Sequence, residues 1–227
     1  TVVDVCTLNE NERNLALTIG TLCNDSKLKS DETNNTKIYG DPTETALVDI
    51  AYKEGLDKNI LESDMPRVAE LPFDSERKLM STLHQVDGKI RVMVKGAPDI
   101  LLRRCTIDRE IQRKIEEQNE NMSAKALRVL GVAYKDIDAV PEEITSDDVE
   151  NGLTFVGLLG MIDPPRLEVK DAVAKCYDAG IRPIMITGDH KLTAIAIAKE
   201  LGIFRDGDLA IVGEELDKIS QEQLTEN

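Results

Sequence analysis

A lysine stands at the end of an apolar, strand-like run in this acidic chain. The stretch VMVKGAPD places Lys95 after alternating apolar residues and directly before Gly96. A glycine lets the backbone come close to a neighbouring group. Two interpretations are open. Either Lys95 is a surface lysine whose aliphatic stem covers the strand end, or its ammonium group reaches into a pocket and meets an anion.

A second set of candidate binding residues lies in the stretch LPFDSERK. Phe73 is one of only three phenylalanines in the chain, and it stands where an apolar run gives way to charged residues. An exposed ring at this place could stack on a planar ligand, a contact worth about 1 kcal/mol. Lys78 and Lys95 would then supply cations for an attached polyphosphate. The alternative is an ordinary core phenylalanine.

Two polar clusters follow apolar runs in the C-terminal part. Thr187, Gly188 and Asp189 lie in MITGDHK, and Asp163 and Arg166 lie in MIDPPR. Ligands of parallel α/β sheets bind at the carboxyl ends of the strands, and a helix N-terminus favours phosphate. Either cluster alone is also consistent with a tight turn. Both clusters at one edge of a sheet favour a phosphoryl-binding site.

The elements that would position the N-terminal candidates form an α+β pattern. Asp41 and Pro42 are typical of a helix N-terminus, and Glu44 stands where a capping box needs it. The pair Asp87-Gly88 is typical of a hairpin turn. The expected elements are strands over 1–7 and 67–73, a hairpin over 78–96, helices over 15–22, 41–55, 99–104 and 111–122, and a loop over 26–36.

The C-terminal part follows a different pattern. A continuous apolar run over 153–162 is followed by a helix, a strand over 181–187, a second helix and a strand over 209–213. This alternation predicts a parallel, doubly wound sheet. The intervening segment 138–152 is acidic and has no apolar periodicity, so we expect the domain boundary there. The fold class is therefore α/β, with an α+β module over 1–148 and a parallel part over 149–227.

Composition excludes several classes of function. The 227 residues carry a net charge of -15, which disfavours nucleic acid because its phosphate backbone would be repelled. No apolar stretch is long enough to cross a bilayer, and the N-terminus does not resemble a signal peptide.

Cysteine and histidine usage points away from metal and disulfide chemistry. The four cysteines are far apart in sequence, which favours reduced, mostly buried thiols in a cytosolic protein. With only two histidines, we expect no His-based metal site.

Taken together, the motifs resemble those of a known family. GDPTETAL, PFDSERKLMS, VKGAPD, MIDPPR and MITGDHKLTAIAIAKELGI occur in the order and rough spacing of the cytoplasmic region of P-type cation-transporting ATPases. The resemblance covers nearly the whole chain and is greatest to the calcium pumps, particularly bacterial ones. It implies a nucleotide-binding domain over 1–148 and, over 149–227, part of a haloacid-dehalogenase-like, Rossmann-type phosphorylation domain.

The resemblance also implies roles for the N-terminal candidates. Phe73 would stack on adenine, Lys95 would line the base pocket, and Glu44 would lie near the adenine amino edge. Lys78 and Arg128 would face the sugar and the phosphates of ATP.

For the C-terminal candidates, the resemblance implies contacts with the reacting phosphate. Thr187, Gly188 and Asp189 would hold the transferred phosphoryl group and nearby magnesium. Asp163 and Arg166 would support the nucleotide contacts that close the two domains.

Some motifs of the family do not occur in this sequence. The phosphorylated D-K-T-G-T and the magnesium-binding G-D-G-x-N-D are both missing, so the chain resembles a fragment of a longer pump. We therefore expect it to bind ATP without turnover, with Mg²⁺ needed only in the intact enzyme and no metal ligands assigned here. Ser75 stands where several animal calcium pumps have a nucleotide-contacting arginine, so the contacts to phosphate are either weaker here or supplied by Arg77 or Lys78.

The expected partners are the remaining phosphorylation, actuator and transmembrane domains of the pump, on the cytoplasmic side of the membrane, with the fragment itself monomeric. Sodium, potassium, proton and manganese pumps remain alternatives to a calcium pump. A non-catalytic regulatory module that binds nucleotide is a second reading. A haloacid-dehalogenase-like phosphatase is a third, although its N-terminal D-x-D strand is absent.

Overall fold

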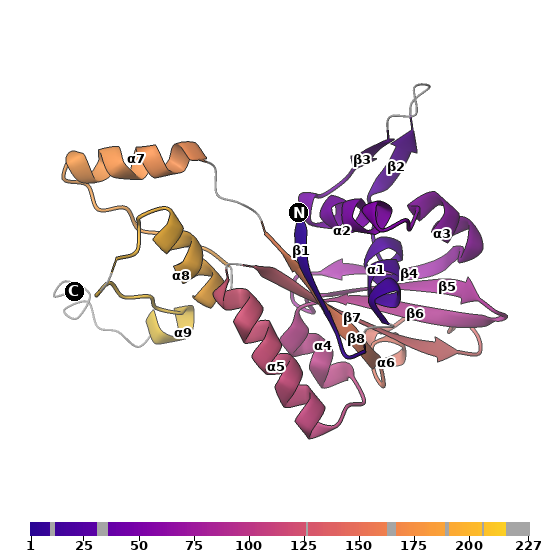
Figure 1. Cartoon of the computed structure of the whole chain (residues 1–227). Coiled ribbons are helices and arrows are strands. Elements are labelled where there is room, and N and C mark those ends of the chain that lie inside the picture. The colour runs from indigo at the N-terminus through magenta and orange to yellow at the C-terminus, as the bar shows by residue number, and fades with distance from the viewer. Residues whose placement is uncertain are drawn as a thin grey trace. The chain divides into compact units, whose positions relative to one another are not determined.

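The structure is a computed structural model that describes residues 1–9, 12–30, 36–125, 127–162, 167–188, 191–205 and 207–216. Internal contacts divide the chain into two compact units (Figure 1). The first comprises Thr1–Met122 and Val129–Ile162, and the second comprises Ser123–Arg128 and Asp163–Asn227.

A six-stranded sheet forms the centre of the first unit. Its strand order is β1-β8-β7-β6-β5-β4, in which β4 to β7 form an antiparallel meander and β8 pairs antiparallel with β1. A separate two-stranded sheet pairs β2 with β3. The strands are β1 (Val2–Thr7), β2 (Lys27–Ser30), β3 (Thr36–Tyr39), β4 (Arg67–Asp74), β5 (Leu79–Val86), β6 (Lys89–Gly96), β7 (Arg128–Ile137) and β8 (Thr154–Met161).

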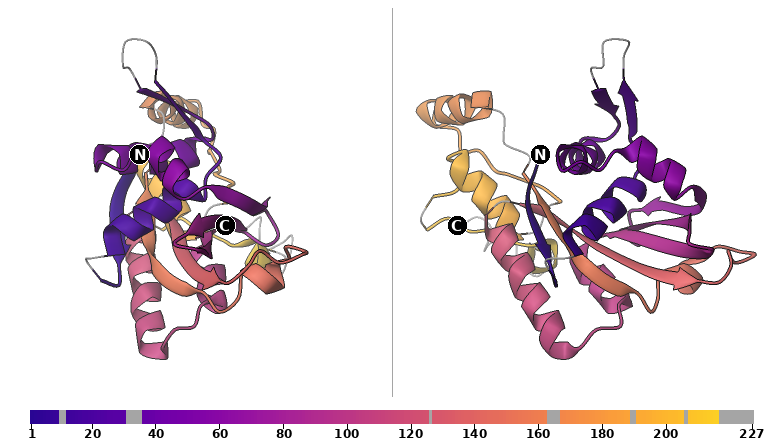
Figure 2. Two further views of the ribbon diagram at one scale, coloured as in Figure 1. Left: turned by 90° about the vertical axis from the view of Figure 1, so that its right-hand side faces the viewer. Right: turned by 45° about the vertical axis from the view of Figure 1, so that its right-hand side comes forward.

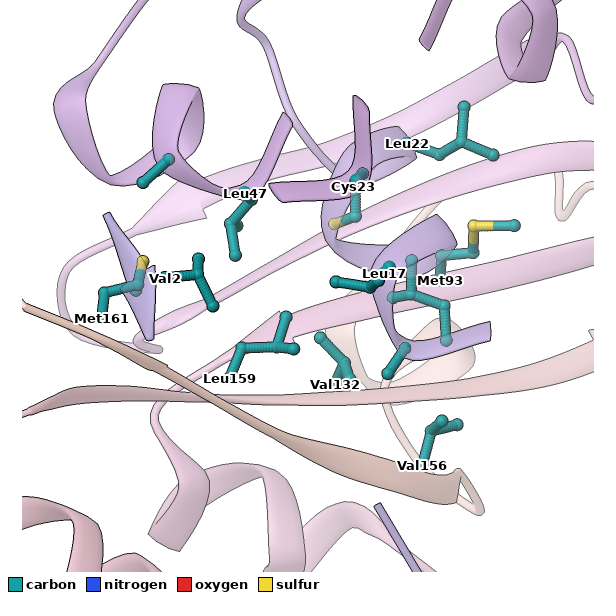
Figure 3. Packing of buried hydrophobic residues seen from close by; sticks show 14 of the residues in the cluster. Val2, Leu17, Leu22, Cys23, Leu47, Met93, Val132, Val156, Leu159 and Met161 are labelled. Carbon is teal, nitrogen blue, oxygen red and sulfur yellow. The ribbon is translucent and has the colours of Figure 1, made fainter. Parts of the chain in front are cut away.

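Helices cover the sheet of the first unit and close its core (Figure 2). Leu17 and Leu47 come from the helices α1 and α2, and they pack against Met93, Val132 and Leu159 of the sheet (Figure 3). The burial of these side chains is the main force that holds the helices on the sheet. The helices are α1 (Arg13–Leu22), α2 (Pro42–Lys53), α3 (Lys58–Asp64), α4 (Pro98–Arg104), α5 (Arg109–Ala124) and α6 (Ser146–Val149).

Two local predictions are confirmed. Asp41 is the N-cap of α2, since its side chain accepts a hydrogen bond from the backbone N–H of Thr43, and Pro42 is the first helical residue. The β5–β6 hairpin turns at Asp87 and Gly88, whose φ angles are 49° and 78°. Both features depend only on neighbouring residues, so the sequence is sufficient to predict them.

Two other predictions for the first unit are wrong. The segment predicted as a loop contains the strand β2, which pairs with β3. The apolar run over 153–162 does not begin a parallel sheet, because β8 pairs antiparallel with β1. Every residue of β8 after Thr154 is buried, and such a run indicates burial on both faces without fixing the direction of the neighbouring strand.

The second unit contains the helices α7 (Leu167–Asp178), α8 (Lys191–Glu200) and α9 (Gly213–Leu216). The segments 181–187 and 209–213 were predicted as strands, but neither forms a strand in the structure. Their isoleucine, leucine and valine side chains are exposed, with Ile184 81% and Ile186 93% accessible. A strand needs neighbouring strands that pair with its backbone N–H and C=O groups. An apolar pattern in the sequence does not show whether such neighbouring strands are present.

The first compact unit extends through β8 to Ile162. The sequence analysis expects the domain boundary earlier, in the acidic segment 138–152. The contact boundary comes later because β8 completes the antiparallel sheet. Among the described residues, no helix is both long enough and apolar enough to span a membrane.

Candidate functional site

Lys95 is a buried lysine in the interior of the sheet. It lies on β6 opposite Met80 of β5 and Val132 of β7, and only 7% of its surface is exposed. Its ammonium group donates a hydrogen bond to Oε1 of Glu44, 2.5 Å away, in the first turn of α2. The interpretation of Lys95 as a surface lysine is therefore wrong. Its ammonium group meets an anion, and in this structure that anion is a carboxylate of the same chain.

The second oxygen of Glu44 is also engaged. Oε2 accepts a hydrogen bond of 3.0 Å from the backbone N–H of Asp25, in the loop after α1. The side chain of Asn24 donates to the backbone carbonyl of Glu44 at 2.9 Å, which joins that loop to α2. Glu44 thus uses its two oxygens to fix Lys95 and the loop together. It does not close the capping box that its spacing predicts.

Two cationic side chains that the sequence analysis did not single out donate hydrogen bonds to the end of α1 and the loop after it. Lys58 donates to the carbonyls of Thr21 and Asn24, and Arg67 donates to those of Leu22 and Asn24. These carbonyls lie at and beyond the C-terminal end of α1, where cations are favoured. Burial lowers the pKa of Lys58 from its usual range. No local motif marks either residue, because each contact joins segments that are distant in sequence.

Phe73 and Lys78 flank the turn between β4 and β5. Phe73 is 61% exposed, so the interpretation as a core phenylalanine is wrong. The register between β4 and β5 shifts from Leu71 to Asp74, and the carboxylate of Asp74 accepts hydrogen bonds from the N–H groups of Glu76 and Arg77. Asp74 thereby shapes a turn whose last residue, Lys78, has a left-handed φ of 56°.

Gly96 allows this turn to lie against the end of β6. A Cβ atom at Gly96 would come within 2.2 Å of the carbonyl oxygen of Lys78. The same oxygen accepts a hydrogen bond of 3.1 Å from Ala97. The close backbone approach expected of Gly96 is therefore present, and it places the Lys78 turn beside the strand end that carries Lys95.

The remaining predicted residues belong to the second unit or lie outside the described residues. Arg128 is the exposed first residue of β7 and belongs to the second unit, as do Thr187 and Gly188, which are exposed in an irregular segment. Asp163, Arg166 and Asp189 lie outside the described residues.

Two depressions of the first unit, of about 230 and 400 Å³, are not lined by Glu44, Phe73, Lys78 or Lys95. The first is lined in part by Cys6 and Phe155, and the second by Thr1 and Asp49. Within the part of the chain that the structure describes, no cluster of His, Cys, Asp and Glu is suited to a metal ion. The four cysteines are free thiols, and burial raises the pKa of Cys105 to about 12.

Comparison with known proteins adds the decisive observation. A family model described as "P-type ATPase, cytoplasmic domain N" matches residues 13–168, which is more than half of the chain. This chain belongs to that family. The match runs through α2, the Phe73 turn, Lys95 and the whole of β8.

Individual P-type ATPases are similar over almost the whole chain. Identity is 44% to calcium-transporting ATPase 1 of Lactococcus lactis and 45% to calcium-transporting ATPase 1 of Bacillus cereus, over 97% and 96% of this chain. A cation-transporting ATPase of Synechocystis is 43% identical over 92%. These matches cover 26%, 25% and 24% of the respective relatives, so the chain spans about a quarter of their length.

One histidine of this P-type ATPase domain is buried within the sheet. His84 is fully buried on β5, with Nδ1 2.8 Å from the carbonyl oxygen of Met65 and Nε2 2.9 Å from the hydroxyl of Thr82. A carbonyl only accepts, so Nδ1 carries the proton, and in the neutral ring Nε2 accepts from Thr82. Burial lowers the pKa of His84, and the nearby charges of Arg67 and Lys58 lower it further.

We expect the fold to lose stability as the pH falls below about 6.5, the usual pKa of histidine in an unfolded chain. There the unfolded state binds a proton that buried His84 does not, and the loss stops once the pH passes below the lowered pKa of the folded state. The check is chemical denaturation of the wild type and His84→Gln between pH 7 and 5. The free energy of unfolding should change less with pH in the variant than in the wild type. An equal change with pH in both proteins would rule out this role of His84, and so would an equally reduced change when the other histidine is replaced, in His190→Gln.

Proposed function

We propose that this chain is the ATP-binding cytoplasmic part of a calcium-transporting P-type ATPase. In this proposal the ring of Phe73 stacks on adenine, Lys95 lines the base pocket and Glu44 lies near the adenine amino edge. Lys78 and Arg128 face the sugar and the phosphates. The chain holds the nucleotide and presents its γ-phosphate to an aspartate that does not occur in this sequence.

The exposed ring of Phe73 is the observation that carries the proposal. The ring is 61% exposed, so its face is available to a planar ligand, and it stands at the end of the sheet where Leu79 pairs with Gly96. Lys95 is the residue before Gly96, and Lys78 is the residue before Leu79. An exposed aromatic ring at a sheet end that also carries two lysines suits a planar base that bears a polyphosphate.

For the C-terminal part, we propose a portion of a haloacid-dehalogenase-like, Rossmann-type phosphorylation domain over 149–227. The supporting observation is the exposed apolar run over 181–187, which neighbouring strands of a longer protein would bury. Thr187, Gly188 and Asp189 would then hold the transferred phosphoryl group. Asp163 and Arg166 would support closure of the two domains.

The pairing of β1 with β8 supports the insertion of the nucleotide-binding module into such a domain. The N–H of Ile162, just after β8, donates to the carbonyl oxygen of Thr1, just before β1, over 2.9 Å. A module inserted into another domain has its two connections at one place, where they act as a hinge. The two antiparallel strands β1 and β8 provide such a paired connection.

In the intact pump, the reaction transfers the γ-phosphoryl group of ATP to the aspartate, forming an acyl phosphate and releasing ADP. Catalysis of this kind consists mostly of positioning, and the residues of this chain bind and orient the nucleotide. Magnesium would neutralise the phosphate charge in the intact pump. Among the described residues, no group of three or more His, Cys, Asp or Glu side chains is placed to hold a metal ion.

Calcium as the transported ion is suggested by the relatives from Lactococcus lactis and Bacillus cereus, both of which are called calcium-transporting ATPases. The proposed location is the cytoplasmic side of the membrane. The partners would be the remaining phosphorylation domain, the actuator domain and the membrane domain of the pump.

The test combines ATP binding by calorimetry with phosphate release by the purified chain. The proposal predicts saturable ATP binding and no phosphate release above the buffer blank. Failure to bind at millimolar ATP would overturn the nucleotide site. Steady phosphate release that Phe73→Ala slows would overturn the expectation that this chain does not turn ATP over.

A further inference from the structure

A buried carboxylate from a distant part of the chain holds the turn between β4 and β5. Glu150 directly follows α6 and has no exposed surface, 0%. Nε of Arg77 lies 3.1 Å from Oε1 and 3.0 Å from Oε2 of Glu150. The hydroxyls of Ser81 and Ser146 donate to Oε1 and Oε2 over 2.7 and 2.6 Å. The buried charge is therefore fully paired, as burial requires.

Arg77, which Glu150 holds, also binds the backbone of the turn between β4 and β5. Its Nη2 donates to the carbonyl oxygens of Pro72 and Leu79, 2.6 and 3.1 Å away. Pro72 is in β4 and Leu79 opens β5, so a single guanidinium group joins both sides of the turn. Glu150 holds that guanidinium group in place. Arg77 thus fixes the backbone directly after Lys78, at the carbonyl of Leu79.

The backbone of Lys78 needs such support. Its φ of 56° is left-handed, a conformation that is unfavourable for a residue with a side chain and persists only where the surroundings fix it. Its N–H donates to Asp74 over 2.6 Å and its carbonyl accepts from Ala97 over 3.1 Å. Strained residues held in this way are concentrated at ligand sites.

We propose that Arg77 and Glu150 are positioning residues that hold Lys78 in the conformation in which it meets the phosphates of ATP. This inference rests on the proposed nucleotide site. In this inference Arg77 acts through Lys78, since Nε and Nη2 of its guanidinium group are already bound within the protein.

The test measures the affinity of the chain for ATP and for adenosine by calorimetry, in Arg77→Lys and Glu150→Gln. Lysine keeps the charge but not the fork of donors, and glutamine keeps the shape of Glu150 without its charge. We expect the Kd for ATP to rise about tenfold, which is the size of effect typical of residues coupled in one hydrogen-bond network. The Kd for adenosine, which has no phosphates, should change much less. The control is Arg91→Lys, which weakens the Arg91–Asp136 pair on the same sheet.

A second measurement separates positioning from general damage to the fold. In a Lys78→Gln background, Glu150→Gln should cause no further loss of ATP affinity, because the residue through which it acts is gone. An equal loss in both backgrounds would overturn the inference, and so would unchanged ATP affinity in both positioning variants. If the unaltered chain binds ATP but the variants do not behave as expected, the positioning role is wrong and the proposed function stands. If the unaltered chain binds no ATP, the positioning role and the proposed function are both wrong.

Discussion

Replacement of Phe73 with alanine is expected to weaken ATP binding by about tenfold or more, since the stacking of one base on an aromatic ring contributes about 1–3 kcal/mol. Stability should hardly change, because the ring is 61% exposed and little of it packs against the protein. Calorimetric titration with ATP measures the first effect, and thermal denaturation measures the second. Adenosine binding should weaken to a similar degree, because the ring contacts the base.

The matched control for this variant is Val68→Ala. Val68 lies on the same strand, β4, and is 46% exposed, but it lies at the other end of that strand. It should leave ATP affinity unchanged. Equal affinity for ATP in the wild type and Phe73→Ala would contradict the role of the ring as the base-stacking surface.

Replacement of Gly96 with alanine is expected to damage both the fold and the nucleotide site. The added methyl group would lie 2.2 Å from the carbonyl oxygen of Lys78 and 3.0 Å from the backbone of Leu79, so the turn must move away from β6. Overpacking of this kind costs about 2 kcal/mol or more, which corresponds to a melting temperature about 5 °C lower. ATP affinity should fall as well, because the turn carries Lys78.

Thermal denaturation and ATP titration of Gly96→Ala test this expectation together. Gly213→Ala serves as the control, since a Cβ atom at Gly213 meets nothing within 4 Å. A Gly96→Ala variant with the melting temperature and ATP affinity of the wild type would show that the close approach of the two backbones does not shape the site.

Sequence was sufficient where structure depends on neighbouring residues. The cap at Asp41 and the turn at Asp87 follow from local hydrogen bonds and backbone preferences, and both were predicted correctly. The exposure of Phe73 was one of two interpretations left open, and its place between an apolar run and a charged one was the useful signal. Lys95 was singled out for a similar reason, although the sequence did not reveal Glu44 as its partner.

Sequence was insufficient where structure depends on distant partners. The direction of β8 is set by its pairing with β1, and apolar content says nothing about that partner. Lys58 contacts a carbonyl 37 residues away, and Arg77 contacts Glu150 across 73 residues, so no local motif marks either contact. For the strand predicted over 181–187, the sequence supplies apolar residues but no pairing partner in the described structure.

The most direct test of the central claim is a titration of the purified chain with ATP, followed by backbone amide NMR shifts. The account predicts saturable shifts at Phe73, Lys78, Lys95 and the first turn of α2, with Val68 and Asp87 unaffected. It also predicts that these shifts disappear in Phe73→Ala at the same ATP concentrations. An absence of saturable shifts at millimolar ATP, or shifts confined to other parts of the chain, would contradict the assignment of this surface as the nucleotide site.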